Sequence, residues 1–176
     1  MKITEASRKF IKKECEKPTA LFKGCFKTHI VVAVKYALKL AEKRKADKEI
    51  VEVATWLHDV GSVSGDPANH HISGAKMAEK FLSNLNYPKE KIEKVKHCIF
   101  SHRASQKIKR ETKEAQIVAD ADALAHYDDI NGLLKRLFKG NKKNVLAKLE
   151  RSYLKLSPDA KLLVKSKLEK ARKDLR

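Results

Sequence analysis

Glycine and proline are scarce in this sequence, with six glycines and four prolines among 176 residues. The chain also lacks runs of alternating apolar and polar residues, which are typical of half-buried β-strands. Its apolar residues recur mostly at intervals of three and four positions, as expected for amphipathic helices. These features predict an all-α protein without internal repeats, and the 42% content of hydrophobic residues predicts a globular one.

Long hydrophobic segments are missing as well. No apolar run approaches the roughly 20 residues that a membrane-spanning helix needs. The strongest candidate, residues 30–34, is ended by Lys35. The first residues, Met1 to Glu5, are charged and lack the apolar core of a signal peptide. We therefore expect a cytoplasmic protein without a membrane partner.

Cysteine is rare too. Cys15, Cys25 and Cys98 form no Cys-x-x-Cys pair, and their odd number leaves one thiol unpaired in any scheme. Reduced thiols in a cytosolic protein are the favoured interpretation. A Cys15–Cys25 disulfide, which would suit a hyperthermophile, is the alternative.

Acidic residues are outnumbered: 22 Asp and Glu stand against 40 Lys and Arg, for a net charge of +18. Residues 131–176 alone carry 15 basic and four acidic residues, a net charge of +11. Such a field favours anionic partners, from nucleotides to nucleic acid. The Lys/Glu-rich surface of a thermophile is the alternative explanation, and we prefer it because the chain has only two glutamines, Gln106 and Gln116.

The length of the chain is sufficient for one hydrophobic core. We predict a single compact domain over residues 1–176, with its core at about 25–130. The basic C-terminal helices, at about 131–176, are expected to pack on that core.

The apolar pattern predicts helices at about residues 3–16, 28–44, from 47 onward, 66–84, 89–102 and 115–125, and three more within 128–176. Gly61 is expected to take the left-handed conformation that ends a helix, and residues 61–66 are expected to form a loop. Asp66 and Pro67 then resemble an N-cap followed by a first-turn proline.

Several histidines interrupt helix faces that should otherwise be apolar. His29 precedes Ala33 and Ala37 at helical spacing, and His58 follows Ala54 by four positions. These two histidines are therefore expected to point inward.

Later histidines differ in their surroundings. His102 ends an apolar series that includes Ile99, and is expected to be an inward residue at a helix end. His70 and His71 both begin apolar faces, so the residue pattern does not choose between them. His97 shares a charged face and is rejected as a ligand.

Residues 115–125 are apolar on nearly all sides except at Asp120 and Asp122, which predicts a buried helix. Asp122 shares a stripe with Val118 and is expected to be deeply buried. Burying an ionised carboxylate costs several kcal/mol unless a cation or hydrogen bonds offset it. A metal ion is the simplest partner, and His126, one turn later, could support the site from behind.

A neutral imidazole and a carboxylate, as in His58 and Asp59, suit zinc, iron, manganese or magnesium. A single buried histidine is more often a core residue than a ligand. Several histidines together with two carboxylates in one small helical domain favour a metal site instead.

Collected in order, these residues resemble the His…His-Asp…Asp signature of the HD-domain metal-dependent phosphohydrolases, at His29, His58, Asp59 and Asp122. Residues 58–61, His-Asp-Val-Gly, resemble the frequent His-Asp-Ile-Gly form of the family. Residues 117–124 resemble the stretch that carries its last aspartate, where the second aspartate is usually the ligand. The resemblance covers about residues 25–130.

Some members of that family add histidines and hold two metal ions. His70, in a His-x-x-x-Gly-Ala pattern, and His102 match these additions. The resemblance thus implies one or two divalent ions, and Zn, Mn, Fe, Mg, Co and Ni are not distinguished. The chain departs from the family after Asp122, where Ala123 and Ala125 replace the more usual Arg and Asp, so the substrate-binding groups stay open.

The resemblance implies a phosphohydrolase that acts on a nucleotide or another small phosphate ester by means of metal-activated water. Asp59 is the expected catalytic residue, as a bridging ligand or as a base for the water. Arg103 and Lys107 are candidates for binding the anionic substrate. Solvated basic residues after a helix end are an equally good interpretation of these two.

Two alternatives stay open. The same site would serve a phosphodiesterase acting on a cyclic (di)nucleotide or RNA. A non-enzymatic nucleic-acid-binding helical protein, with a structural metal site, would instead use the basic C-terminal helices. Against it, we find no clear helix-turn-helix, and the few aromatic residues do not interleave with the basic ones. The oligomeric state is left open.

Overall fold

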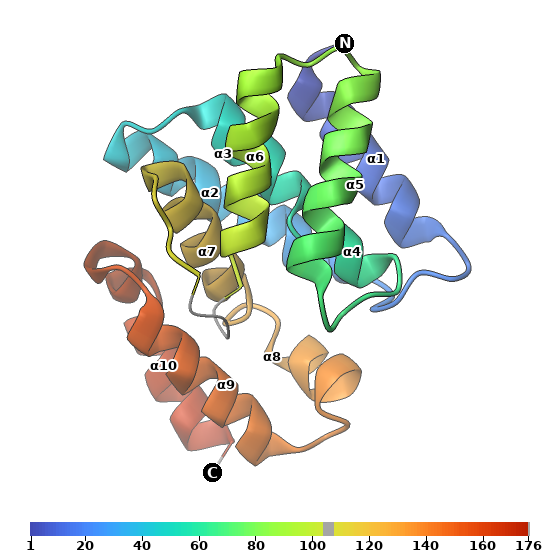
Figure 1. Ribbon diagram of the computed structural model, residues 1–176. Helices are drawn as coiled ribbons and strands as arrows, with labels where there is room; N and C mark the ends of the chain where they lie inside the picture. Colours follow the sequence, from blue (N-terminus) through green and yellow to red (C-terminus); the bar gives the residue numbers. More distant parts are fainter. Residues whose placement is uncertain (104–107, 176) are drawn as a thin grey trace.

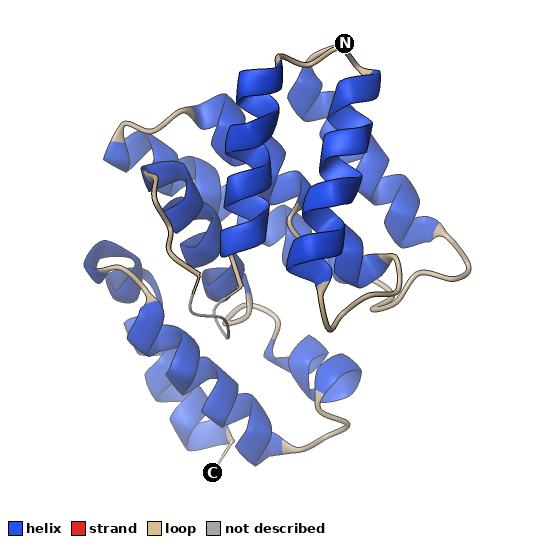
Figure 2. Ribbon diagram, viewed as in Figure 1, coloured by secondary structure: helices blue, strands red, loops and turns tan. Residues whose placement is uncertain are grey.

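The structure of the protein is a computed structural model that describes residues 1–103 and 108–175. In these residues the regular structure is helical and no strand occurs (Figure 2), which confirms the predicted all-α class. The elements, labelled in Figure 1, are α1 (Ile3–Glu16), the π-helical turn η1 (Phe26–Ile30), α2 (Val31–Arg44), α3 (Lys48–Leu57), α4 (Val60–Val63), α5 (His70–Asn84), α6 (Lys89–Ser101), α7 (Lys113–Ala125), α8 (Ile130–Gly132), the π-helical turn η2 (Leu133–Leu137), α9 (Lys142–Lys155) and α10 (Pro158–Asp174).

Several helix boundaries follow directly from local sequence. α1 ends before Pro18, as predicted. α3 begins after Asp47, whose side chain accepts hydrogen bonds from the backbone N–H groups of Glu49 and Ile50 at 3.0 and 3.1 Å. A carboxylate at this position satisfies two N–H groups that have no partner within the helix, and it complements the positive end of the helix dipole.

α2 and α7 pack against each other and take part in two hydrophobic clusters. The first cluster includes Val34 of α2 and Val118 of α7, and joins them to α1, α3, α4, α5 and α6. The second includes Leu40 of α2 and Leu124 of α7, and joins them to α9 and α10. Because α2 and α7 are covered on two sides, the polar residues at their ends are held in fixed positions.

A buried polar network ties the C-terminal helices to this centre. Asp120 of α7 is only 1% exposed and accepts a hydrogen bond from Arg44 Nη2 at 2.8 Å. Arg44 also donates to Asp159 Oδ1 of α10 at 2.6 Å, and Ser157 Oγ donates to Asp120 Oδ2 at 2.5 Å. This Arg44 network gives the buried carboxylate its counter-charge. It also holds α10 beside α2 and α7, at the end of the molecule away from the N-terminus (Figure 1).

The expectation that Gly61 takes a left-handed conformation is wrong. Gly61 lies inside the short helix α4, and the positive φ of 114° belongs to Gly65. Glycine is required at position 61 for a different reason, because α4 crosses close to α5. A Cβ atom on Gly61 would lie 2.5 Å from Ser73 Oγ and 2.7 Å from the backbone nitrogen of Gly74. The predicted loop is therefore helical in its first part.

One other boundary differs from the prediction. α5 begins at His70 and not at Pro67, because the Asp66 side chain accepts from the Asn69 N–H at 3.0 Å and closes a separate turn first. The three helical segments expected after about residue 128 are present: α8 continues into η2 over residues 130–137, and α9 and α10 follow. Asp129 caps the first of them by accepting from the Gly132 N–H at 3.1 Å.

The structure also bears on the predictions about membrane-spanning helices and cysteines. None of their helices has the length and apolar character needed to cross a lipid bilayer. The three cysteines are free thiols, as favoured from the sequence, with the Sγ atoms of Cys15 and Cys25 3.9 Å apart.

Candidate metal centre

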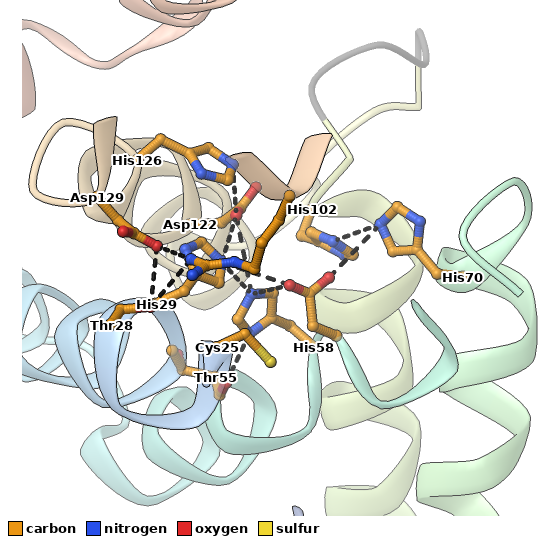
Figure 3. Close-up of polar contacts among 12 residues, drawn as sticks. Cys25, Thr28, His29, Thr55, His58, His70, His102, Asp122, His126 and Asp129 are labelled. Atoms are coloured by element: carbon orange, nitrogen blue, oxygen red, sulfur yellow. Dashed lines mark hydrogen bonds and ion pairs between the residues drawn. The ribbon is translucent and has the colours of Figure 1, made fainter. Parts of the chain in front are cut away.

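Histidines and carboxylates from the ends of several helices meet at one place (Figure 3). His29 comes from η1, and His58 and Asp59 lie between α3 and α4. His70 is the first residue of α5, and His102 follows α6. Asp122 lies near the end of α7, and His126 follows that helix. We call this set of seven residues the His/Asp centre. It contains all six of the predicted metal ligands.

Three of the histidines are held in the same way. The Nδ1 atoms of His58, His70 and His102 lie 2.7, 3.0 and 2.5 Å from the carbonyl oxygen of the residue three positions earlier. A carbonyl oxygen only accepts hydrogen bonds, so Nδ1 is the donor. In a neutral ring Nε2 then carries a free lone pair, which is the usual arrangement of a metal-ligating histidine.

Two of these lone pairs face each other. His70 Nε2 and His102 Nε2 lie 3.2 Å apart, and neither nitrogen has a proton to donate when both rings are neutral. Burial, together with the electrostatic effect of the neighbouring His58, lowers the pKa of His102 to about 4, so this ring is neutral at pH 7. A cation bound by both nitrogens would replace repulsion with attraction. The imidazole and carboxylate donors present here fit a divalent metal ion.

Asp59 stands between two groups of histidines. Its Oδ2 atom lies 3.4 Å from His29 Nε2 and 3.5 Å from His58 Nε2, whereas its Oδ1 atom lies 3.8 Å from His70 Nε2. Potential ligand atoms therefore form one group with His29 and His58 and another with His70 and His102, and Asp59 belongs to both. Such a carboxylate is suited to bridge two ions.

Asp122 lies next to the first group, with its Oδ1 atom 3.2 Å from His29 Nε2 and 3.8 Å from His58 Nε2. The expectation that it is deeply buried is wrong, because 16% of its side chain is exposed. The deeply buried carboxylate is Asp120. Residues two positions apart in a helix point in nearly opposite directions, so Asp120 faces the Arg44 network and Asp122 faces the His/Asp centre.

His126 contacts Asp122 directly, which is consistent with the expectation that it supports the site, but it was not predicted as a potential ligand. His126 Nε2 lies 3.4 Å from Asp122 Oδ1, and its ring stacks on that of His29 with centroids 4.6 Å apart. His29, Asp122 and His126 thus form a third group of potential ligands. The spacing of four positions between Asp122 and His126 was the available signal, because such residues are neighbours on a helix surface.

The charges of the centre are strongly coupled. Burial lowers the pKa of His29, but the carboxylates of Asp122 and Asp59 outweigh it and raise the pKa to about 10. Burial raises the pKa of both carboxyl groups, yet the neighbouring histidines, first His58 for Asp59 and His126 for Asp122, hold each pKa well below its usual value. Without metal, a proton on His29 thus balances part of the negative charge. A divalent ion would displace that proton.

Two histidines lie outside the His/Asp centre. The ring of His71 packs on Phe100 with centroids 5.5 Å apart, so of the two candidates left open by the sequence His70 is the one that faces the centre. His97 Nε2 accepts from the backbone N–H of Glu111 at 3.1 Å and belongs to none of the potential ligand groups of the described residues.

A cavity of about 320 Å³ opens beside the His/Asp centre. Its lining includes Arg103, together with Arg136 of η2 and Lys148 of α9. Arg103, one of the two predicted substrate-binding residues, also donates to the carbonyl oxygen of Ala68. The other, Lys107, lies outside the described residues.

The helical fold and the cluster of histidines and aspartates at its helix ends are those of a helical protein that could bind metal ions. Within that class, the sequence profile of the HD domain matches residues 26–127, and the chain belongs to the HD domain family. The family places it in the metal-dependent phosphohydrolase superfamily, whose HD domains bind divalent metal ions.

Solved structures share the fold. The crystal structure of Bacillus subtilis YpgQ in complex with ADP is 18% identical, with a TM-score of 0.69, and the match covers 98% of this chain and 94% of that one. A Lactobacillus plantarum protein is 16% identical, with a TM-score of 0.71 and coverage of 98% and 93%. At such identities the likeness establishes the fold. No match was found among curated protein sequences.

Proposed function

We propose that this protein is a phosphohydrolase that cleaves a nucleotide or another small phosphate ester with the help of one or two divalent ions. The observation that carries the proposal is the shared position of Asp59. Its two oxygens face two separate pairs of histidines, and the Nε2 lone pairs of the second pair oppose each other at 3.2 Å. A purely structural histidine cluster has no need of such an arrangement.

A divalent ion in this centre would supply an activated water at neutral pH and would neutralise charge on a phosphoryl oxygen. One ion would be held by His29, His58, Asp59 and Asp122. A second ion would be held by Asp59, His70 and His102. Asp59, with its lowered pKa, is ionised and can accept a hydrogen bond that orients the attacking water. The backbone carbonyls behind His58, His70 and His102 fix the ring orientations in advance.

The kind of substrate is inferred from charge and size. The net charge of +18 and the cations that line the cavity favour an anionic ligand. The cavity, at about 320 Å³, is at the small end of the range for small-molecule sites. ADP is bound in the crystal structure of YpgQ, and this supports nucleotides as the first compounds to test.

The test is a turnover screen with protein reconstituted separately with Mn²⁺, Mg²⁺, Co²⁺, Ni²⁺, Zn²⁺ and Fe²⁺. Nucleotides, cyclic dinucleotides and a short RNA are supplied, and release of phosphate or nucleoside is measured. We expect metal-dependent hydrolysis of a nucleotide by the wild type and by His97→Ala, because His97 lies outside the centre.

Cleavage restricted to cyclic dinucleotides or RNA would select the phosphodiesterase alternative. Salt-sensitive binding of nucleic acid without turnover in any metal would reject the enzyme and favour the binding protein.

A further inference from the structure

The C-terminal helices form part of the wall of the cavity. Lys148 and Ser152 of α9 line it, as do Leu133, Arg136 and Leu137 of η2. All of these residues lie beyond the segment 26–127 that matches the HD domain profile. The chain therefore supplies groups to the cavity that the family signature does not include.

Lys148 differs from the other two cations of the cavity wall. Arg136 is paired with Asp129 and also donates to Thr28 at 3.0 Å, and Arg103 donates to Ala68. Lys148 has no ion pair and no hydrogen bond with the residues that the structure describes, although its side chain is half-buried in the wall. Its ammonium group is therefore available to an anion that enters the cavity.

The position of Lys148 is set by the packing of α9. Val145 and Leu149, on the same helix, are fully buried in the second hydrophobic cluster. Tyr127 Oη donates to the Leu149 carbonyl at 2.7 Å, so the residue after His126 holds α9 in place. Lys148 precedes Ser152 by one helical turn, and both therefore face the cavity from the same side of α9.

Lys148 shares its cavity with residues of the His/Asp centre. Asp122 and His126 line the same cavity, as does Arg103. Figure 3 shows His126 and His70 on opposite sides of the centre. Arg103 directly follows His102, whose Nε2 atom lies 3.2 Å from that of His70. The cavity wall thus receives cations from two separate parts of the chain, α9 and the residue after His102.

We propose that Lys148 is a substrate-binding residue that holds a phosphoryl oxygen, so that the C-terminal helices complete the site instead of merely packing on the core. This inference rests on the proposed function for the identity of the anion as a phosphate ester. It assigns to one residue a role that the net charge of the C-terminal region only indicates in general terms.

The test compares Lys148→Ala with Lys143→Ala. Both substitutions remove one positive charge from α9, but Lys143 is exposed and does not line the cavity. Binding of inorganic phosphate to the Mg²⁺-loaded protein is measured by calorimetry. We expect Lys148→Ala to weaken binding about 10- to 100-fold, as for the loss of a hydrogen bond to a charged group. Lys143→Ala should change it less than about twofold, and Lys148→Arg should recover most of the affinity.

The melting temperature of Lys148→Ala should equal that of the wild type, because no described contact is lost. Equal phosphate affinities for the two alanine variants, or no phosphate binding by the wild type, would overturn the role of Lys148. Phosphate binding that depends on Lys148, in a protein without turnover of any ester, would instead reject the proposed function and keep this residue as an anion ligand.

Discussion

His70 Nε2 and His102 Nε2 lie 3.2 Å apart although 32 positions separate the two residues. The hairpin of α5 and α6 explains this proximity, because the first residue of α5 meets the residue that follows α6 (Figure 1). Each ring is oriented by a hydrogen bond from Nδ1 to the carbonyl oxygen three positions earlier, that of Pro67 or Ile99, so that its Nε2 atom faces the other ring. The fold thus presents two potential ligands of one ion side by side.

Metal content follows from this geometry. We expect about two ions per wild-type chain after dialysis, and about one per His102→Ala chain, because that substitution removes half of the opposed pair and leaves the group around His29 intact. Mass spectrometry of the metal content checks both values. One ion per chain in wild type and variant alike would exclude the two-ion form and leave a one-ion hydrolase.

Asp59→Ala should reduce turnover of the best substrate by roughly 10²- to 10⁴-fold, because it removes a ligand and the group that orients the water. The helical fold should persist, since Asp59 is partly exposed and its side-chain partners are the histidines of the centre. Circular dichroism follows the fold in the same samples. Near-normal turnover by a folded, metal-saturated variant would remove Asp59 from the mechanism, and a collapsed fold would make its role structural.

Metal uptake should release protons. The pKa of His29 is raised to about 10 in the metal-free protein, against an ordinary value near 6.5, so His29 is protonated throughout the neutral range. A metal ion must displace this proton, and we expect about one proton released per chain at pH 8 and an affinity that rises about tenfold per pH unit up to pH 10. Calorimetry in buffers of different ionisation enthalpy measures the release.

The same raised pKa predicts the stability of the metal-free protein. The contribution of protonated His29 is fully present below pH 6.5 and is lost as the pH rises towards 10. His29→Gln should show neither this loss nor the proton release. A wild type that takes up metal without releasing protons would contradict the charge state described here.

Gly61→Ala should destabilise the protein by about 1–3 kcal/mol, a typical cost of overpacking. The added Cβ would lie 2.7 Å from both the Gly74 nitrogen and the His70 carbonyl oxygen, so α4 and α5 would have to separate. Gly74→Ala is the matched control, because its Cβ would find its nearest neighbours at 3.4–3.5 Å. Thermal melts of both variants give the comparison, and equal losses of stability would show that the close approach of α4 to α5 is unimportant.

Arg44→Met should cost about 3–5 kcal/mol, because it leaves the buried carboxylate of Asp120 without its counter-charge. Lys43→Met provides the control. Lys43 also contacts Asp159, at 3.8 Å, but is 60% exposed, and such pairs contribute about 0–1 kcal/mol. Urea unfolding of the two variants measures the difference, and a small effect of Arg44→Met would mean that the network does not stabilise the fold.

The fold class and the inward positions of His29, His58, His102 and Asp122 could be predicted from the sequence because each depends on helical periodicity. Asp59 and His70 were predicted from the resemblance to the HD-domain family instead. His29, His58 and His102 interrupt apolar stripes, and such an interruption is visible without knowing which helices meet. The choice of His70 over His71 depended on how α5 is rotated against α6, which local pattern does not record. The same holds for the role of Gly61, which depends on where α5 crosses α4.

The partners of Asp120 and the position of Lys148 could not be predicted from the sequence either, because both depend on distant parts of the chain. The counter-charge of Asp120 comes from Arg44 and further hydrogen bonds come from Ser157, both more than 30 positions away. Lys148 is one of 40 basic residues, and only the packing of α9 against α7 and η2 brings it to the cavity. Sequence periodicity identifies which face of a helix is buried, but it does not identify the element that covers it.

Because α2 and α7 are covered on two sides, a shortened chain that lacks one of the covers should fold poorly. A fragment cut at residues 26–127 would keep every residue of the His/Asp centre, yet it would uncover Leu40 and Leu124. It would also remove the hydrogen bonds of Ser157 to Asp120, which would keep only Arg44 and Gln116 as partners. It would also lose α1, which packs on α3 and α4. We expect such a fragment to aggregate rather than bind metal. We therefore expect the stretch that can fold by itself to be longer than the stretch by which the family is recognised.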